Sequence, residues 1–102
     1  MSIETITEKI VALETAARNW IDAEDSWKKA EREWDGLFIA EYMRGTPQEK
    51  LWITVASTER GQELLDLIER RRAKVRVAAS NYDLAVRILD MQIAVEPRHR
   101  SD

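Results

Sequence analysis

Few side chains of this chain could perform chemistry, and the single histidine is the first of them. His99 follows Glu96 by three positions, and Glu-x-x-His is the helical spacing that carboxylate-bridged di-metal bundles use. Pro97 stands inside this motif, and the sequence holds no second copy of it. We therefore interpret His99 as a solvated residue of the C-terminal tail, and we expect no metal site.

Pairs of carboxylates are a second candidate for chemistry. Asp22 with Asp25, or Glu31 with Glu33, could act as general acid and base if burial separated their pKa values. No glycine-rich phosphate loop, serine-centred elbow or metal-ligand signature accompanies them. On a charged amphipathic helix such acids are solvated or ion-paired, so we predict that the protein is not an enzyme and has no cofactor.

A basic run is the third candidate. Five of the seven residues from 70 to 76 are basic, namely Arg70, Arg71, Arg72, Lys74 and Arg76. Such a run could neutralise several phosphates. On a helix, however, its members point in different directions, and acidic residues earlier in the chain offer intramolecular partners. A nucleic-acid-binding accessory factor that uses this face is our alternative hypothesis for the function.

The composition indicates long helices with charged surfaces. Of 102 residues, 44% are hydrophobic and 34% charged, with only 3 Gly and 2 Pro, which nearly excludes β-sandwiches and barrels. The absence of cysteine excludes disulfides and thiolate chemistry. The net charge of −3 is divided unevenly, because residues 1–45 hold 10 acids against 6 bases and residues 46–102 hold 9 against 10. The two halves are therefore electrostatically complementary.

No segment has the composition of a membrane helix. The longest apolar runs are a few residues, such as Leu37 to Ala40, whereas a bilayer requires about 20. Glu4 stands where a signal peptide would carry a basic residue. We expect a cytoplasmic protein without membrane contact.

Apolar residues recur every seven positions near the N-terminus. Counted in heptads from Ile3, every d position is apolar: Ile6, Leu13, Trp20, Trp27 and Trp34. The indole rings of the three tryptophans cover about 20 Å along one face of the helix. We interpret this stripe as core or self-interface on a helix from about residue 3 to 44.

Residues 45–58 contain the signals that end and start helices. Gly45 suits a left-handed C-terminal residue, Thr46 an N-cap, Pro47 the first helical turn, and Glu49 the reciprocal member of a capping box. These residues predict a short helix over about 47–56. Ser57 and Thr58 are candidate caps for a helix over about 58–95. The alternative is that the short helix and this one form a single continuous helix.

The last helix carries a second apolar stripe. Its members include Ile68, Val75, Tyr82 and Leu89, and the helix is expected to end before Pro97, with a frayed tail at 97–102. Two long helices of similar length joined by a short connection predict an antiparallel hairpin. This hairpin places Trp27 near residues 71–75 and Trp20 near residues 78–82.

One tripeptide resembles a known motif. Trp34-Asp35-Gly36 is similar to the Trp-x-Gly motif of the small helical hairpins exported by type VII secretion, which dimerise. In that family the motif occupies the turn between the helices, whereas here the turn signals lie at 45–47. The family's C-terminal Tyr-x-x-x-Asp/Glu is also missing, because Val86 follows Tyr82 by four positions. We do not adopt this kinship.

The resulting prediction is a single all-α domain, an antiparallel long-helix hairpin with a short connecting helix. Each helical stripe is broader than one partner can cover, so we expect a homo-oligomeric, coiled-coil-like helical bundle. Trp52 lies outside the heptad series and is the indole that we expect to face a partner. The predicted function is a non-enzymatic protein-binding adaptor or inhibitor. Small cysteine-free helical proteins of this kind are common among phage and mobile-element products, and such a source is our working hypothesis.

Overall fold

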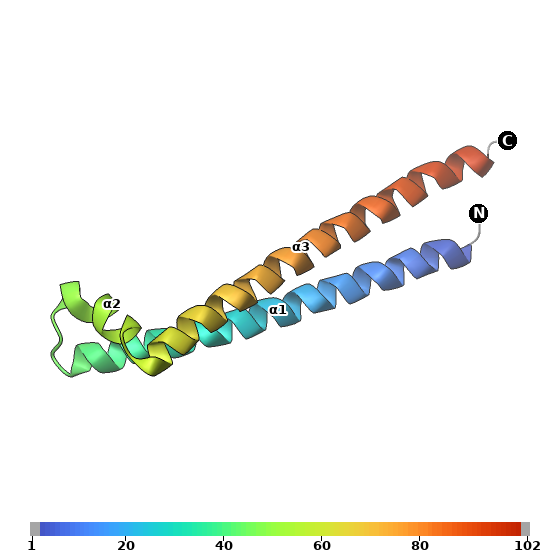
Figure 1. Ribbon diagram of the computed structural model, residues 1–102. Coiled ribbons are helices and arrows are strands. Elements are labelled where there is room, and N and C mark those ends of the chain that lie inside the picture. The colour runs from blue at the N-terminus through green and yellow to red at the C-terminus, as the bar shows by residue number, and fades with distance from the viewer. Residues whose placement is uncertain (1–2, 101–102) are drawn as a thin grey trace. The chain divides into compact units, whose positions relative to one another are not determined.

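The computed structural model describes residues 3–100, and the side chains of residues 3–95. It contains three helices, α1 (Ile3–Met43), α2 (Gln48–Ala56) and α3 (Glu59–Arg100), and no strand among the described residues (Figure 1). The all-α class and the hairpin packing of α1 with α3 are thus confirmed. The chain forms two compact units. The terminal unit comprises Met1–Asp22 and Val75–Asp102, and the central unit comprises Ala23–Lys74.

The terminal unit is an antiparallel helix pair with little interior. It consists of the first half of α1 and the last part of α3, and Trp20 packs against Tyr82 with ring centroids 5.2 Å apart. This contact confirms the expected pairing of Trp20 with residues 78–82. Among the described residues of this unit, Ala78 alone is buried. The unit therefore lacks a closed hydrophobic core.

The central unit has a small core where three helices meet. The rest of α1, all of α2 and the start of α3 enclose Ala30, Leu51, Val55, Ala56 and Leu64. Leu64 has no exposed surface. Five of the six buried hydrophobic residues in the described chain lie in this unit, so it is the better packed of the two, and burying a leucine side chain contributes about 2 kcal/mol.

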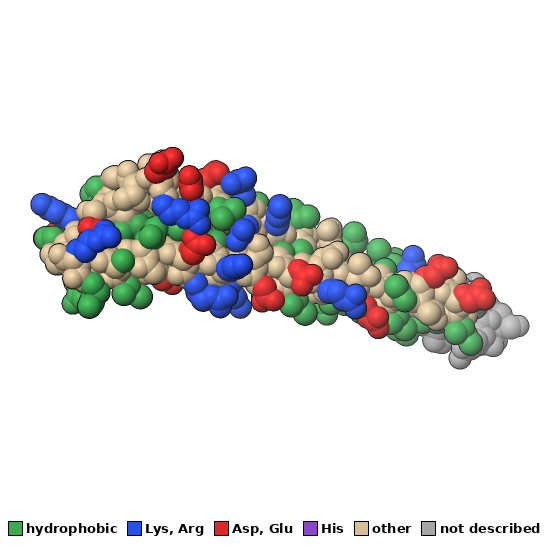
Figure 2. Space-filling model, turned by 90° about the horizontal axis from the view of Figure 1, so that it is seen from below, with side chains coloured by type: hydrophobic (Ala, Val, Ile, Leu, Met, Phe, Trp, Pro, Cys, Tyr) green, Lys and Arg blue, Asp and Glu red, His purple; other side chains and the backbone are tan. Residues whose placement is uncertain are grey.

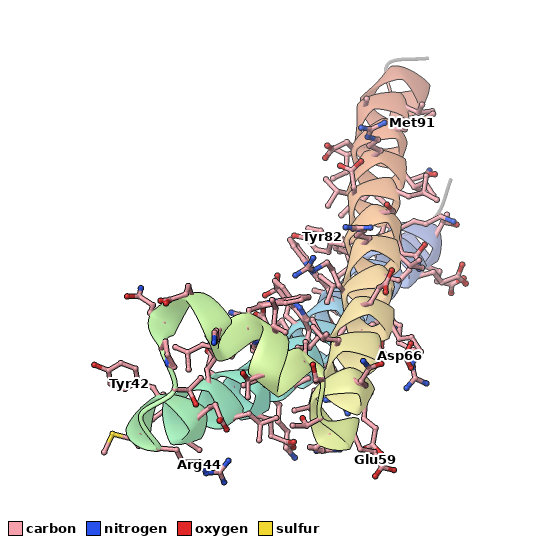
Figure 3. The ribbon with its side chains drawn as sticks, turned by 60° about the vertical axis from the view of Figure 1, so that its left-hand side comes forward. Tyr42, Arg44, Glu59, Asp66, Tyr82 and Met91 are labelled. Atoms are coloured by element: carbon pink, nitrogen blue, oxygen red, sulfur yellow. The ribbon has the colours of Figure 1, made fainter. Side chains whose placement is uncertain are left out.

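The turn between α1 and α2 is set by Gly45. Its φ of 92° is the left-handed conformation expected from the sequence, and its N–H donates to the carbonyl of Tyr42 at 3.0 Å. The labels of Tyr42 and Arg44 mark this end of α1 in Figure 3. A side chain at Gly45 would be strained because L-residues rarely adopt this φ.

The expected capping box is wrong. Pro47, not Thr46, is the N-cap of α2, and no side chain caps that helix. The Thr46 hydroxyl instead donates to a Glu41 carboxylate oxygen at 2.8 Å, and the Arg44 guanidinium donates to the other oxygen, also at 2.8 Å. The Thr46 hydroxyl thus bonds back to α1 and does not cap the start of α2.

The break between α2 and α3 is real, and Thr58 caps α3. Its hydroxyl accepts the Gly61 N–H at 3.0 Å and donates to the Val55 carbonyl at 2.7 Å. Gly61 is buried, and a Cβ at this position would overlap the Val55 carbonyl oxygen. Glycine is therefore required here by the close approach of α2 to α3.

The end of α3 corrects a second expectation. The helix continues through Pro97 to Arg100 instead of ending before the proline. Proline removes one N–H donor and crowds the carbonyl four residues earlier, which disturbs a single turn while neighbouring turns keep their hydrogen bonds. Of the predicted frayed tail, residues 97–100 are helical, and residues 101–102 lie outside the described part.

Candidate interaction site

The predicted core or self-interface residues are half-buried without exception. The nine are Ile6, Leu13, Trp20, Trp27, Trp34, Ile68, Val75, Tyr82 and Leu89. Trp34 packs against Phe38 on the same helix, with centroids 5.3 Å apart. In the central unit, the Arg72 guanidinium lies over the Trp27 ring at 5.5 Å, within the expected 71–75 region. These rings therefore act as packing surface within their own units.

Two of the indoles leave their polar atom unused. The Nε1 atoms of Trp20 and Trp27 are buried, and neither has a hydrogen-bond partner in the described part of the chain. An unpaired buried N–H costs about 1–3 kcal/mol. The rings must recover this cost through packing area, so the structure gives no sign that these N–H groups orient a ligand.

Three cations of the basic run have partners within the chain. Arg70 pairs with Asp66 at 3.2 Å, and Arg71 donates to the carbonyl of Ser26 at 2.8 Å. Arg72 lies 4.0 Å from Glu31 as well as over Trp27. The expected contact between the acidic part of α1 and this run is thus present at Glu31. Lys74 and Arg76 are exposed.

Arg60 is an ion-pair residue that the sequence reasoning missed. It contacts Glu33 on α1 and Glu63 on its own helix, the latter at 3.1 Å. Its hydrogen bonds to Glu33 and then to Glu63 raise the pKa of Arg60 above its usual value. Both Glu31 and Glu33 are therefore ion-paired with arginines, which is one of the two states that the sequence predicts for these acids. Because 27 residues separate Arg60 from Glu33, spacing along one helix could not predict this pair.

The outer face of α2 exposes two large apolar side chains. Trp52 is 57% exposed and Ile53 is 64% exposed, whereas the other three tryptophans are half-buried. They border a groove of about 300 Å³ that is also lined by Ala56, Ser57, Gln62 and Leu65. Gln62 fixes one wall, because its amide donates to the Ala56 carbonyl at 3.0 Å. The sequence did not predict that Ile53 and Leu65 share this groove, because spacing along one helix does not show which side chains meet across two helices.

Groups that could support metal chemistry do not converge in the described residues. No cluster of three or more His, Asp or Glu side chains with the geometry to hold an ion occurs there. The side chains of Glu96 and His99 lie outside the described part. Across the described helices, none combines the length and apolar character needed to cross a membrane.

Comparisons of the chain with protein-family models, with curated proteins and with solved structures found no match. The surfaces of the described helices are therefore the features that bear on the function.

Proposed function

We propose that the protein is a non-enzymatic, cytoplasmic protein-interaction module that captures an amphipathic helix of another protein on the outer face of α2. The observation that carries this proposal is the pairing of Trp52 and Ile53, both more than half exposed, beside an apolar groove in the best-packed unit. Tryptophan is enriched among residues that dominate binding energy. A rigid helix that presents an apolar pair beside a groove suits helix-in-groove recognition.

The module is also proposed to self-associate. The terminal unit has two helices with broad apolar stripes, yet only Ala78 is buried among its described residues. A helix pair of this kind gains most of its stability from packing against further helices. A second copy of the chain supplies these further helices without a different protein being required. This arrangement suits an adaptor or inhibitor, and a phage or mobile element remains the working hypothesis for its source.

Nucleic-acid binding stays the alternative function. It is less favoured because Arg70, Arg71 and Arg72 each have an intramolecular partner, and phosphate binding would have to compete with those contacts. Arg70, Arg72, Lys74 and Arg76 are exposed, but among them only Lys74 and Arg76 make no ion pair or ring contact with another described side chain, and two cations neutralise too few phosphates for stable binding at physiological salt.

The protein-binding proposal can be tested with a displayed library of amphipathic helical peptides. The library is panned on the wild-type chain, with a soluble Trp52→Ala/Ile53→Ala chain as competitor. We expect enriched peptides with apolar anchors at i, i+3 or i+4, and i+7, and affinities at least about 10-fold weaker for Trp52→Ala. Ile39→Ala is a matched control, because Ile39 is 63% exposed on α1 of the same unit. Peptides that bind the double variant as tightly as wild type would contradict the proposal.

A further inference from the structure

A second heptad stripe runs along α3 in the terminal unit, beside the stripe that packs against α1. Its positions are separated alternately by four and three residues, and they are Val77, Asn81, Leu84, Ile88, Met91 and Val95. All six side chains are exposed, and the five apolar ones range from 38% at Ile88 and Val95 to 68% at Met91. We call these six residues the outer seam. Met91 is labelled on α3 in Figure 3.

The outer seam differs from the stripe that packs against α1. The inner stripe has the same alternating spacing and consists of Val75, Ala78, Tyr82, Ala85, Leu89 and Gln92, all buried or half-buried. One helix thus carries two coiled-coil patterns, and its own chain covers only one. In Figure 2, hydrophobic side chains reach the surface between charged ones. A full heptad stripe left in water is unusual in a monomer, where exposed apolar residues are scattered.

Grooves within the terminal unit adjoin the outer seam. One, of about 280 Å³, lies between Ala12 and Ala16 of α1 and Asn81, Leu84, Ala85 and Ile88 of α3, with Lys9 at its edge. A second, of about 270 Å³, continues from Lys9 and Ile88 to Met91, Gln92 and Val95. Small alanines on the floor leave room for the side chains of another helix. Five of the six outer-seam residues line these grooves.

We infer that the outer seam is the homodimer interface, and that its occupant is the same seam of a second copy, with the two α3 helices parallel. The inference rests on the self-association part of the proposed function and is independent of the α2 face. A seam with heptad spacing is complementary to itself, because a two-fold axis along the helices brings each position against its own copy.

The residue types support two parallel strands. If Asn81, Ile88 and Val95 are a positions, then Val77, Leu84 and Met91 are d positions. In parallel coiled coils, β-branched residues at a with leucine at d favour two strands, a pattern that Leu84 with Ile88 and Val95 follows, and a single asparagine at a sets the register. In the parallel arrangement Asn81 meets Asn81 of the second copy, and the two amides can bond to each other. An antiparallel pairing centred between Leu84 and Ile88 would instead place Asn81 against Met91, with no partner for the amide.

Few charged side chains lie beside the outer seam. Arg87 precedes Ile88 on one flank, and its guanidinium pairs with Asp83 on the same helix at 3.0 Å. Ser80 and Ala94 occupy the equivalent positions one heptad away on either side, and neither carries charge. On this flank of α3, Arg87 is therefore the one charged side chain, and Lys9 of α1 is the other cation beside the outer seam, at the edge of both grooves.

The test is sedimentation equilibrium from about 1 µM to about 1 mM, the range of dissociation constants that weak to moderate interfaces show. We expect a mass near twice 11.9 kDa at high concentration for the wild type. The variant Leu84→Glu/Ile88→Glu should dissociate at least 100-fold more readily with unchanged helical circular dichroism, because both side chains are already exposed in the single chain. Ile93→Glu is the control, since Ile93 is 51% exposed on the same helix but outside the seam.

Single-cysteine variants test the direction of pairing, because the chain has no native cysteine. Asn81→Cys and Ile88→Cys should each form a disulfide-linked dimer on mild oxidation, whereas Asp90→Cys should not. Cross-linking of Asn81→Cys with Met91→Cys in a mixture, without self-linking of either, would overturn the parallel pairing. A wild-type monomer throughout the concentration range would overturn both the inference and the proposed self-association. An oligomer that Leu84→Glu/Ile88→Glu leaves intact would overturn the seam alone.

Discussion

The indole of Trp20 on α1 lies against the phenol ring of Tyr82 on α3, with centroids 5.2 Å apart and ring planes inclined by 41°. This tilted pair joins residues 62 positions apart in the sequence and sits in a unit where only Ala78 is buried among the described residues. It is therefore a direct side-chain contact that joins the two antiparallel helices of that unit.

Removing either ring should destabilise the terminal unit measurably. We expect Trp20→Ala to lower the free energy of unfolding by about 2–3 kcal/mol, since the ring is half-buried rather than enclosed. A double-mutant cycle with Tyr82→Ala should give a coupling of about 0.5–1.5 kcal/mol in urea denaturation. Tyr42→Ala, at a position 62% exposed, is the control with a small effect. A coupling within experimental error would show that the rings do not support each other.

Two glycine-to-alanine substitutions should change the stability of the fold in opposite directions. Gly61→Ala places a methyl group against the Val55 carbonyl and should cost about 3 kcal/mol or more, because both partners are backbone of packed helices. Gly36→Ala meets no atom within 4 Å in the middle of α1 and should stabilise the fold by up to about 1 kcal/mol. Thermal denaturation followed by circular dichroism measures both. Equal effects of the two substitutions would refute the tight approach of α2 to α3.

The turn after α1 should respond to acid. The hydrogen bond from Thr46, followed by that from Arg44, holds the pKa of Glu41 below its usual value of 4.5, against partial burial, which raises it. Because the folded-state pKa is the lower one, this carboxylate stabilises the fold above about pH 4.5, and the contribution is lost as pH falls through the folded-state pKa. In carboxyl NMR titrations, Thr46→Val should raise the pKa of Glu41, while Thr46→Ser should leave it low. An unchanged pKa in Thr46→Val would remove Thr46 as the cause.

Neighbouring arginines of the basic run should contribute unequally to stability. The Arg71 guanidinium on α3 donates to the Ser26 carbonyl on α1. Arg71→Ala should therefore lower the free energy of unfolding by about 1–2 kcal/mol. Arg70 makes an exposed pair with Asp66 one turn away, and Arg70→Ala should change stability by less than about 0.5 kcal/mol. Urea titrations of the two variants provide the comparison. A larger loss of stability in Arg70→Ala than in Arg71→Ala would contradict the predicted stabilising role of Arg71.

The same contacts predict weak binding to nucleic acid. We expect dissociation constants for labelled duplex DNA and single-stranded RNA no tighter than about 10⁻⁴ M at physiological salt, the weak end of non-specific binding. Fluorescence anisotropy across a series of salt concentrations is the measurement. Tight binding with a steep salt dependence that Arg71→Ala/Arg72→Ala abolishes would favour the alternative function over protein binding.

The positions of the helices were predictable from local sequence signals. The heptad series from Ile3, the left-handed Gly45 and the cap at Thr58 each depend on residues within one or two turns, and all three are found in the structure. Even the pairing of Trp20 with Tyr82 followed from two helices of matched length joined by a short connection. The errors were also local: the Thr46 hydroxyl bonds to Glu41 instead of capping α2, and one proline does not end α3.

Which surfaces are covered was decided by the tertiary structure. The sequence shows apolar periodicity on α3, but the inner and outer stripes have the same spacing, and only packing against α1 determines which of them is buried. Likewise, the need for glycine at position 61 and the exposure of Trp52 depend on how closely α2 approaches α3. Spacing along one helix determines which residues share a face, whereas contact between distant segments determines which face is shielded from water.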